Sequence, residues 1–462
     1  MAATVNLDYN YLFASSLASQ TALNRSLRLA TSGGAERNPY FFQGRIISPK
    51  QTADLLLTLS AISRTRFFSP GEIRERMLNA ADPVVTSDGS RLRFEVFSVC
   101  CGTYARLDLQ PDALDAQWLG KGTTNVDFNP PMRASLATVM NSENVALNIG
   151  SDRLELERSG ESVIERKVKL PLRWLKGFVE VQVYQSTLKP AMELPVLELA
   201  KMIRTLPQQN FLQAGTISYL IPAGKSLRLS QRDAPGAVAV GAISRLRTLE
   251  PILRYAKSVK IYSSHEAISA FELSFTNGKF FFVLSPNAAR GFSGEGQALS
   301  ALAQSGSVDA LARVKSALAW QEEISVPKLS SSLGISAETL EEALQVLGTR
   351  GLVGYDLSAG AYFHRELPFD LGLVEELHPR MKKARELHEQ KQVRYSIKRD
   401  NEVEAYVRGR TGDYYVQLNA DGARCTCDWF AKNQGNRGPC SHILAAELAI
   451  QEDEPNAFNP LG

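Results

Sequence analysis

Apolar and polar residues alternate in three short runs near the end of the chain, at residues 393–398, 402–408 and 414–419. A period of two is typical of a β-strand with one buried face. Turn residues lie between the runs, at Asp400-Asn401 and at Thr411-Gly412, so we expect the strands to form a meander. The pattern then becomes helical, because Ile443, Leu444 and Leu448 fall on one face.

A second pattern, at residues 301–368, predicts three helices followed by a hairpin. The markers are Val314, Leu318 and Trp320 in the first helix, Pro327 at the start of the second, and Ser336 as the cap of the third. In the third helix the apolar residues recur at spacings of four and three, at Leu340, Leu344 and Leu347. The hairpin strands are expected at 352–357 and 361–364. This order of elements resembles a winged helix-turn-helix.

Three roles stay open for this module: base reading in DNA, contact with a protein, and a structural spacer. If the third helix were a DNA-recognition helix in the major groove, its first residues would lie beside the phosphates of the DNA. Here those residues include Glu338, Glu341 and Glu342, which phosphates would repel. The acidic side chains favour protein contact.

The middle of the chain predicts the same order of elements twice: a strand, a helix and then three strands. The first copy has a strand at 123–127, a helix with Met132, Leu136, Val139 and Met140, and strands at 145–149, 153–158 and 163–170. The second has a strand at 237–242, a helix with Leu246, Leu249, Ile252 and Leu253, and strands at 259–263, 267–275 and 279–284. An internal repeat of this order resembles the modules of DNA sliding clamps in topology. Two unrelated α+β units are the alternative.

Amphipathic helices are also expected at 51–63 and 70–80, and a connector at 185–195. Together these patterns predict an α+β multidomain protein. Its expected parts are a helical N-terminal region (1–90), a first α+β module (91–184), a second (185–300), a winged helix (301–368) and a C-terminal meander with a helix (379–452).

Composition places the chain among globular proteins, because 44% of its 462 residues are apolar and 22% are charged. The net charge of +3 is too small for a general attraction to nucleic acid or membrane. No run of eighteen apolar residues occurs, and no basic segment precedes the first apolar residues. We therefore expect a cytoplasmic protein without a membrane span.

The five cysteines do not fit a disulfide framework, because they are odd in number and three of them crowd near the C-terminus. Those three form two doublets with a histidine: Cys425 with Cys427, and Cys440 with His442. Three thiolates and one imidazole are a ligand set that tetrahedral Zn²⁺ prefers, and four protein ligands leave no open position. The site is predicted to be structural. The adjacent pair, Cys100 and Cys101, is expected to be buried.

The meander, the C-x-C and C-x-H doublets and the final helix together resemble the SWIM zinc finger, over about 393–450. Cys425, Cys427, Cys440 and His442 match its four ligand positions. The resemblance implies binding of DNA or of protein partners.

The rest of the chain is similar to bacterial SWIM-containing proteins that accompany MoxR-type AAA+ ATPases and von Willebrand factor A domain proteins. The similar stretches are 38–42, 81–85, 97–102, 104–106 and 171–175. This resemblance implies a role in a chaperone-like or stress-linked ATPase system, with the ATPase supplied by another chain.

Cations are concentrated in the C-terminal part, where residues 379–442 carry thirteen Lys and Arg against eight Asp and Glu, a local charge of +5. Cations interleaved with aromatic residues can hold a nucleic-acid backbone. The candidates are Lys382, Lys383, Arg385, Arg394, Lys398, Arg424, Lys432 and Arg437. Our first hypothesis is nevertheless a non-enzymatic adaptor that binds protein, with DNA binding as the alternative, because no catalytic constellation stands out.

We expect the purified protein to contain about one Zn²⁺ per chain, since zinc binding can contribute about 10 to 16 kcal/mol at neutral pH to the folding of such small sites. Elemental analysis measures the metal directly. Replacing Cys425, Cys427, Cys440 and His442 should remove the metal and lower the stability of the C-terminal part. Metal-free material, or unchanged stability in the variants, would contradict the prediction.

Overall fold

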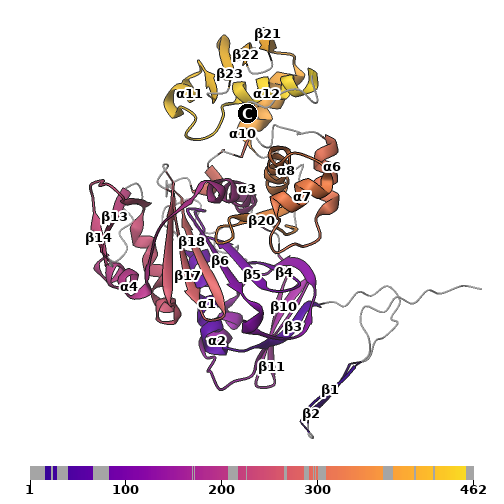
Figure 1. The fold of residues 1–462 in the computed structure, drawn as a ribbon, viewed down its shortest axis with the longest axis vertical. Coiled ribbons are helices and arrows are strands. Elements are labelled where there is room, and N and C mark those ends of the chain that lie inside the picture. Colours follow the sequence, from indigo (N-terminus) through magenta and orange to yellow (C-terminus); the bar gives the residue numbers. More distant parts are fainter. Residues whose placement is uncertain are drawn as a thin grey trace, which may run out of the picture. The chain divides into compact units, whose positions relative to one another are not determined.

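The computed structural model describes residues 16–21, 24–28, 40–65, 83–168, 170, 172–206, 217–224, 226–264, 268–285, 291–294, 296, 298, 299, 308–367, 378–399, 402–419 and 422–453. The chain divides into two compact units, Met1–Tyr40 and Phe41–Gly462. In the first unit, β1 (Ser16–Thr21) and β2 (Asn24–Arg28) form an antiparallel hairpin. The second unit contains the large sheets and the helices (Figure 1).

A five-stranded sheet has the order β11-β10-β9-β3-β7. Its strands are β3 (Tyr40–Ile46), β7 (Leu114–Leu119), β9 (Val145–Gly150), β10 (Arg153–Arg158) and β11 (Glu161–Arg166). A three-stranded sheet, in the order β14-β13-β15, consists of β13 (Ile217–Ala223), β14 (Ser226–Ser230) and β15 (Val238–Gly241).

An eight-stranded sheet has the order β12-β16-β17-β18-β6-β5-β4-β8. Its strands are β4 (Val84–Asp88), β5 (Leu92–Phe97), β6 (Thr103–Leu109), β8 (Lys121–Asn125), β12 (Lys189–Pro195), β16 (Ser258–Ser263), β17 (Ser269–Phe275) and β18 (Gly278–Leu284). At its centre β6 pairs antiparallel with β18, from Leu109 opposite Gly278 to Thr103 opposite Leu284. Strands that we expected in two separate modules therefore share one sheet.

Helices cover these sheets and bury a common core. They are α1 (Pro49–Arg64), α2 (Pro130–Ala137), α3 (Leu172–Thr187), α4 (Val196–Thr205) and the 3-10 helix η4 (Ile243–Tyr255). The core is one continuous cluster that includes residues from Phe41 to Leu367. Phe97 lies in an aromatic group within it, with ring centroids 5.9 Å from Trp174 and 5.0 Å from Phe178 of α3. No helix within the described ranges combines the length and apolar character needed to span a bilayer.

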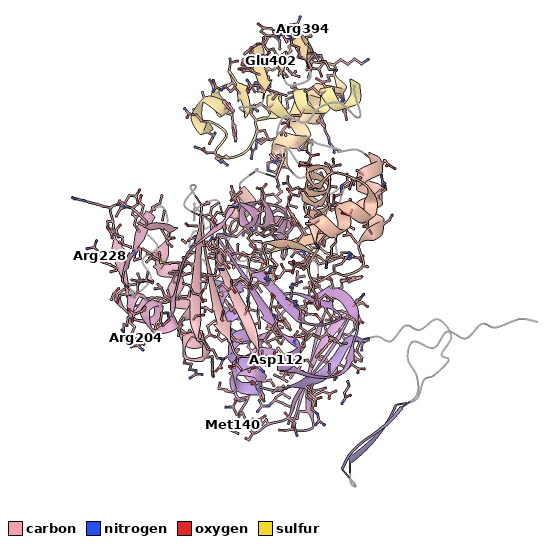
Figure 2. All side chains as sticks on the ribbon, viewed as in Figure 1. Asp112, Met140, Arg204, Arg228, Arg394 and Glu402 are labelled. Carbon is pink, nitrogen blue, oxygen red and sulfur yellow. The ribbon has the colours of Figure 1, made fainter. Side chains whose placement is uncertain are left out.

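The expected order of a strand, a helix and three strands is present in both predicted copies. The first is β8, α2, β9, β10 and β11, and the second is β15, η4, β16, β17 and β18. Among the described residues two further series were not predicted: β3, α1, β4, β5 and β6, and β12, α4, β13, β14 and β15, in which β15 is shared with the next copy. Residues 66–82, between α1 and β4, and 207–216, between α4 and β13, lie outside the description. Met140 was assigned to the buried face of α2, but its side chain is exposed (Figure 2). The helix ends at Ala137, before that position.

Three other expectations differ from the structure. The N-terminal region was expected to be helical, yet β3 and β4 are strands there, because Phe41, Phe42 and Val84 are buried as parts of sheets. The expected connector at 185–195 contains β12, the edge strand of the eight-stranded sheet as far as the described residues go, and prolines are tolerated at a sheet edge because no described strand pairs with its outer side. The helix predicted at 70–80 lies outside the described residues.

Residues 308–364 form the helical module, with the expected order of elements. It consists of α6 (Val308–Ala317), α7 (Val326–Leu333), α8 (Ala337–Thr349) and a hairpin of β19 (Val353–Asp356) and β20 (Ala361–His364). Ser336 caps α8 as predicted, accepting a hydrogen bond from the backbone N–H of Thr339 at 3.1 Å. Leu318 and Trp320 follow α6 rather than belong to it.

The hairpin of this module is fixed to the eight-stranded sheet by a buried ion cluster. Asp356 pairs with Arg93 of β5 at 3.2 Å and with Arg106 of β6 at 3.1 Å. The Arg93 guanidinium also lies 3.7 Å from the ring centroid of Phe363 in β20. Burial alone would raise the pKa of Asp356, but the two guanidinium groups outweigh it and hold that pKa well below its usual range.

A second buried pair joins the chain just after the hairpin to the same sheet. Arg365 pairs with Glu95 of β5, and both side chains are almost fully buried. Glu95 also accepts a hydrogen bond from the hydroxyl of Tyr104 at 2.6 Å. Burial would raise the pKa of Glu95, but the charge of Arg365 outweighs it and lowers that pKa. The module and the sheet thus share two desolvated ionic contacts.

Residues 379–453 form the finger unit. It contains α10 (Pro379–Glu389), a sheet in the order β21-β22-β23-β24, and two further helices. The strands are β21 (Val393–Arg399), β22 (Glu402–Arg408), β23 (Asp413–Asn419) and β24 (Gly422–Cys425), and the helices are α11 (Asp428–Asn433) and α12 (Ser441–Asp453). The three-stranded meander and the final helix are confirmed. β24 and α11 were not predicted.

A short segment far upstream connects the finger unit to the larger core. Leu299 is fully buried in the finger core together with Met381 and Leu444. The preceding residue, Ala298, packs against Leu175 and Val179 of α3. Two consecutive side chains therefore enter two different hydrophobic clusters.

Removing one partner of the buried Arg365–Glu95 pair should lower the stability of the protein strongly. We expect Arg365→Met to lower the free energy of unfolding by about 3–5 kcal/mol, because it leaves the Glu95 carboxylate buried without its cation. The double variant Arg365→Met with Glu95→Gln should recover most of this loss. Arg153 forms an exposed ion pair with Asp152 and provides the control. Arg153→Met should lower the free energy of unfolding by only about 0–1 kcal/mol. Denaturant unfolding checks all three, and equal effects of Arg365→Met and Arg153→Met would contradict the prediction.

Candidate metal centre

The four predicted ligands come from three elements that meet at one end of the finger sheet. Cys425 is the last residue of β24, and Cys427 is the N-cap residue of α11. Cys440 directly precedes α12, and His442 lies in the first turn of that helix. The second doublet therefore sits at the start of the helix that the apolar positions from Ile443 predicted. The spacer between the doublets begins with α11, which was not predicted.

The donor atoms are close enough to share one ion. The three Sγ atoms and a ring nitrogen of His442 all lie within 4.8 Å of one another. Cys425 Sγ and His442 Nδ1 are 3.8 Å apart. Tetrahedral Zn²⁺, with Zn–S near 2.3 Å and Zn–N near 2.0 Å, requires donors about 3.5–3.8 Å apart. The residues therefore fit Zn²⁺, and Cys425, Cys427, Cys440 and His442 are positioned to bind it.

Backbone N–H groups at the starts of the two helices point at the thiolates. Phe430 donates to Cys427 Sγ at 3.4 Å, and Ile443 donates to Cys440 Sγ at 3.5 Å. Such donors stabilise negative charge at a helix N-terminus. The pKa of Cys427 lies well below its usual range, because the thiols of Cys425 and Cys440 hydrogen-bond to its thiolate and the Phe430 N–H adds to them. The same shared hydrogen bonds raise the pKa of Cys425 and of Cys440, so the three thiols titrate as one group.

The imidazole of His442 is held in place by an aromatic stack. Its ring lies 4.2 Å from that of Tyr414, at an interplanar angle of 21°. A Cβ atom on Gly409 would lie 2.6 Å from the Tyr414 ring and 3.2 Å from His442 Nε2. The glycine thus leaves the space that the stack occupies. Neither Tyr414 nor Gly409 was predicted to support the site, because neither belongs to the ligand doublets.

The eight candidate nucleic-acid-binding residues are distributed over several elements of the finger unit. Lys382, Lys383 and Arg385 lie on α10, Arg394 and Lys398 on β21, Arg424 on β24, Lys432 on α11, and Arg437 in the turn before Cys440. Several of them have anionic or aromatic partners. Arg394 pairs with Asp413 at 2.6 Å, and Lys383 pairs with Glu386 at 3.2 Å. Arg437 lies 5.8 Å from the ring centroid of Trp429.

The outer face of the finger sheet carries both signs of charge. Strand register places Arg394 opposite Tyr406 and Tyr406 opposite Tyr415, so these three form one row. Neighbouring positions on that face are Glu404 and Arg424, on either side of Gln417. Figure 2 labels Arg394 of β21 and Glu402 of β22. The face therefore carries cations and carboxylates together with tyrosines.

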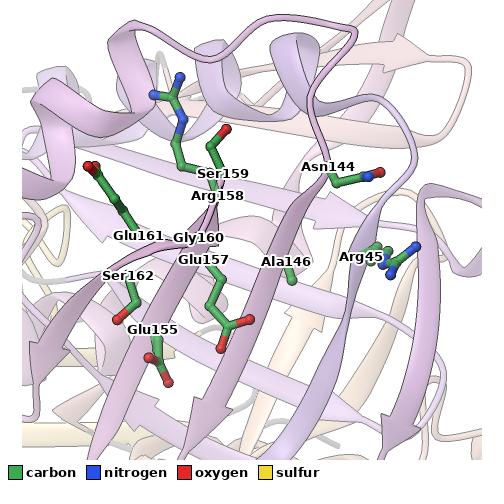
Figure 3. A pocket seen from close by; sticks show the side chains of 10 residues that line it. All are labelled: Arg45, Asn144, Ala146, Glu155, Glu157, Arg158, Ser159, Gly160, Glu161 and Ser162. Atoms are coloured by element: carbon green, nitrogen blue, oxygen red, sulfur yellow. The ribbon is translucent and has the colours of Figure 1, made fainter. Parts of the chain in front are cut away.

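Two other features carry no site. Cys100 and Cys101 are buried as expected, and burial raises the pKa of Cys101 to about 12, which keeps its thiol protonated. A pocket of about 550 Å³ opens beside the turn between β10 and β11 (Figure 3). Two of its lining side chains have protein partners, since Arg158 pairs with Glu143 at 2.7 Å and Glu157 accepts from Asn148 at 2.8 Å. We assign no ligand to it.

Comparison with known proteins identifies the finger. The sequence model of the SWIM zinc finger family matches residues 414–451, which include all four ligands. Two solved structures also match: Proliferating Cellular Nuclear Antigen from Entamoeba histolytica, and the PCNA2–PCNA3 complex from Sulfolobus tokodaii. The first has 12% identity and a TM-score of 0.36, covering 54% of this chain and 99% of its own. The second has 10% identity and a TM-score of 0.37, covering 53% and 99%. No curated protein matches this chain.

Adding a methyl group beside the histidine stack should weaken metal binding. We expect Gly409→Ala to raise the zinc dissociation constant by about 10-fold or more, because the Tyr414 ring can give way only by moving against the ligand His442. Tyr414→Phe, which keeps the ring and loses only the hydroxyl, is the control and should bind zinc as the unmodified protein does. Competition with a chromophoric chelator measures both. Equal affinities for the two variants would contradict this account of the stack.

Proposed function

We propose that this chain is a non-enzymatic, zinc-dependent adaptor that binds other proteins through its finger unit. The metal site supports a structural rather than catalytic role, because Cys425, Cys427, Cys440 and His442 occupy all four positions of a tetrahedral ion. Zinc would hold β24, α11 and α12 together and so maintain the surface of the unit.

The observation that carries the proposal is the charge pattern of the finger surface. A nucleic-acid site needs cations that are available to phosphates. Arg394 and Lys383 instead pair with carboxylates of the same unit, and Glu404 lies among the strand residues of the outer face. A surface with both signs of charge is suited to complementary charges on a protein.

Exposed aromatic residues on the same face support protein binding. The side chain of Tyr406 is 44% exposed, and its ring centroid lies 5.6 Å from that of Tyr415. Tyrosine and arginine are enriched at the centres of protein interfaces, where a few residues supply most of the binding energy. Tyr406, Tyr415 and Arg394 form such a group, which we call the tyrosine row.

The helical module is proposed to be a winged helix that serves internal attachment. Its hairpin supplies Asp356 to the ion cluster and Phe363 to the packing on Arg93. A wing used in this way is not free to lie along a DNA backbone. Glu338 and Glu341 at the start of α8 are exposed, which also disfavours phosphate contact.

The proposed partners are a MoxR-type AAA+ ATPase and a von Willebrand factor A domain protein. Support for this choice comes from the sequence resemblance at 38–42, 81–85, 97–102, 104–106 and 171–175. In this scheme the ATPase supplies the energy, and the zinc-dependent adaptor supplies binding. A cytoplasmic location follows from the same proposal.

Binding of the full-length chain to each purified candidate partner tests this function. We expect the double variant Tyr406→Ala with Tyr415→Ala to weaken binding by about 10-fold or more, because it removes two interface aromatics. Chelation of zinc should have a similar effect. Tyr219→Ala, at a half-exposed tyrosine of β13, is the matched control and should bind normally. Calorimetry or surface plasmon resonance gives the affinities. Absence of binding to both partners would refute the proposed pairing.

DNA binding is the second candidate, because Lys382, Arg424 and Lys432 are exposed. Duplex and single-stranded DNA should be titrated with the same full-length protein at several salt concentrations. An affinity that falls steeply with added salt would favour DNA, whereas no binding at low salt would remove it.

A further inference from the structure

Arg380 contacts both segments that carry the zinc ligands, although it lies outside the residues that match the finger family. It is in the first turn of α10, far upstream of the matched segment. Its Nη1 donates hydrogen bonds to the backbone carbonyls of Arg437 and Pro439, each at 2.8 Å. Pro439 directly precedes the ligand Cys440.

The same guanidinium lies against the other ligand segment. Its Cζ atom is 4.5 Å from the ring centroid of Trp429, which belongs to α11, the helix capped by Cys427. Cation–π contacts of this kind are strongest with tryptophan. One side chain therefore bridges the helix that follows Cys427 and the turn that leads to Cys440.

The turn held by Arg380 has little intrinsic order. Gly435 and Gly438 both have positive φ, at 79° and 73°, a conformation that glycine adopts without steric cost. Glycine-rich segments lose much conformational entropy when they are fixed. Hydrogen bonds from a guanidinium to two carbonyls of the turn, with residue 438 between them, restrict it at the point where Cys440 must reach the metal.

Space for the guanidinium is provided by another glycine. A Cβ atom on Gly296 would lie 2.1 Å from Arg380 Nη2 and 2.8 Å from its Cζ. The charge of Arg380 also stabilises the centre. Three thiolates and Zn²⁺ together have a formal charge of minus one, and the guanidinium places a positive charge beside them.

We propose that Arg380 is a positioning residue for the zinc site. It sets the distance between Cys427 and Cys440 through Trp429 and the 437–439 turn, and so reduces the conformational freedom that metal binding must remove. The planar shape of the guanidinium is essential to this role, because the group contacts two carbonyl oxygens and the indole ring at the same time.

Zinc release from the full-length holoprotein tests the proposal. We expect Arg380→Ala to raise the zinc dissociation constant about 10- to 100-fold, the range typical for residues that orient metal ligands. Arg380→Lys keeps the charge but not the planar fork, and should show most of the same loss. Lys383→Ala, on the exposed side of α10, is the matched control and should leave zinc affinity unchanged. Chelator competition followed by absorbance gives the constants.

A second measurement separates positioning from general stabilisation. The unfolding temperatures of Arg380→Ala and the unmodified protein should differ with zinc bound and coincide after the metal is chelated. A difference of the same size in both states would show that Arg380 supports the fold regardless of metal, and would overturn the proposal. Zinc affinity unchanged in Arg380→Ala, or fully restored in Arg380→Lys, would overturn it as well.

Discussion

The contact of Asp356 with Arg93 and Arg106 determines where the helical module lies on the large sheet. Burying guanidinium groups is unfavourable unless carboxylates lie close to them. Asp356 lies 3.2 Å from Arg93 Nη2 and 3.1 Å from Arg106 Nη2, and Asp108 of the sheet lies 3.0 Å from Arg106 Nη2. Such pairing is directional, whereas apolar contact would permit several positions. The ion cluster therefore fixes the hairpin in one place.

Other contacts follow from this placement. With the hairpin fixed, α8 lies against α3, and Gly348 allows their close approach, since a Cβ there would be 2.6 Å from Gln182 Nε2. From α3 the packing continues to Ala298, and through its neighbour Leu299 to the core of the finger unit. Ala298 and Leu299 are consecutive, so the chain passes at this point from a small cluster on α3 into the core of the finger unit.

Within the finger unit, apolar packing and the metal ion stabilise different segments. The sheet and the helices α10 and α12 bury a small apolar core that includes Val403, Val416 and Ile443. Cys425, Cys427 and Cys440 belong to this core, whereas the turn at 433–438 has no apolar side chain, so the order of that turn depends on the ion and on the contacts of Arg380. Loss of zinc would therefore affect this turn before the rest of the core.

The amino-acid sequence alone determined the zinc ligands, the meander and the last helix, and the order of elements in the middle of the chain. These are local properties: ligand spacing, a period of two or of 3.6, and capping residues such as Ser336 can all be read without knowing what packs against them. Tertiary structure decided the rest. Only pairing of β6 with β18 shows that the two expected modules share one sheet, because strand partners distant in sequence leave no periodic signal. In the same way, Arg93, Arg106 and Arg380 resemble ordinary surface cations in the sequence, and only their three-dimensional neighbours, Asp356 and the 437–439 turn, give them their roles.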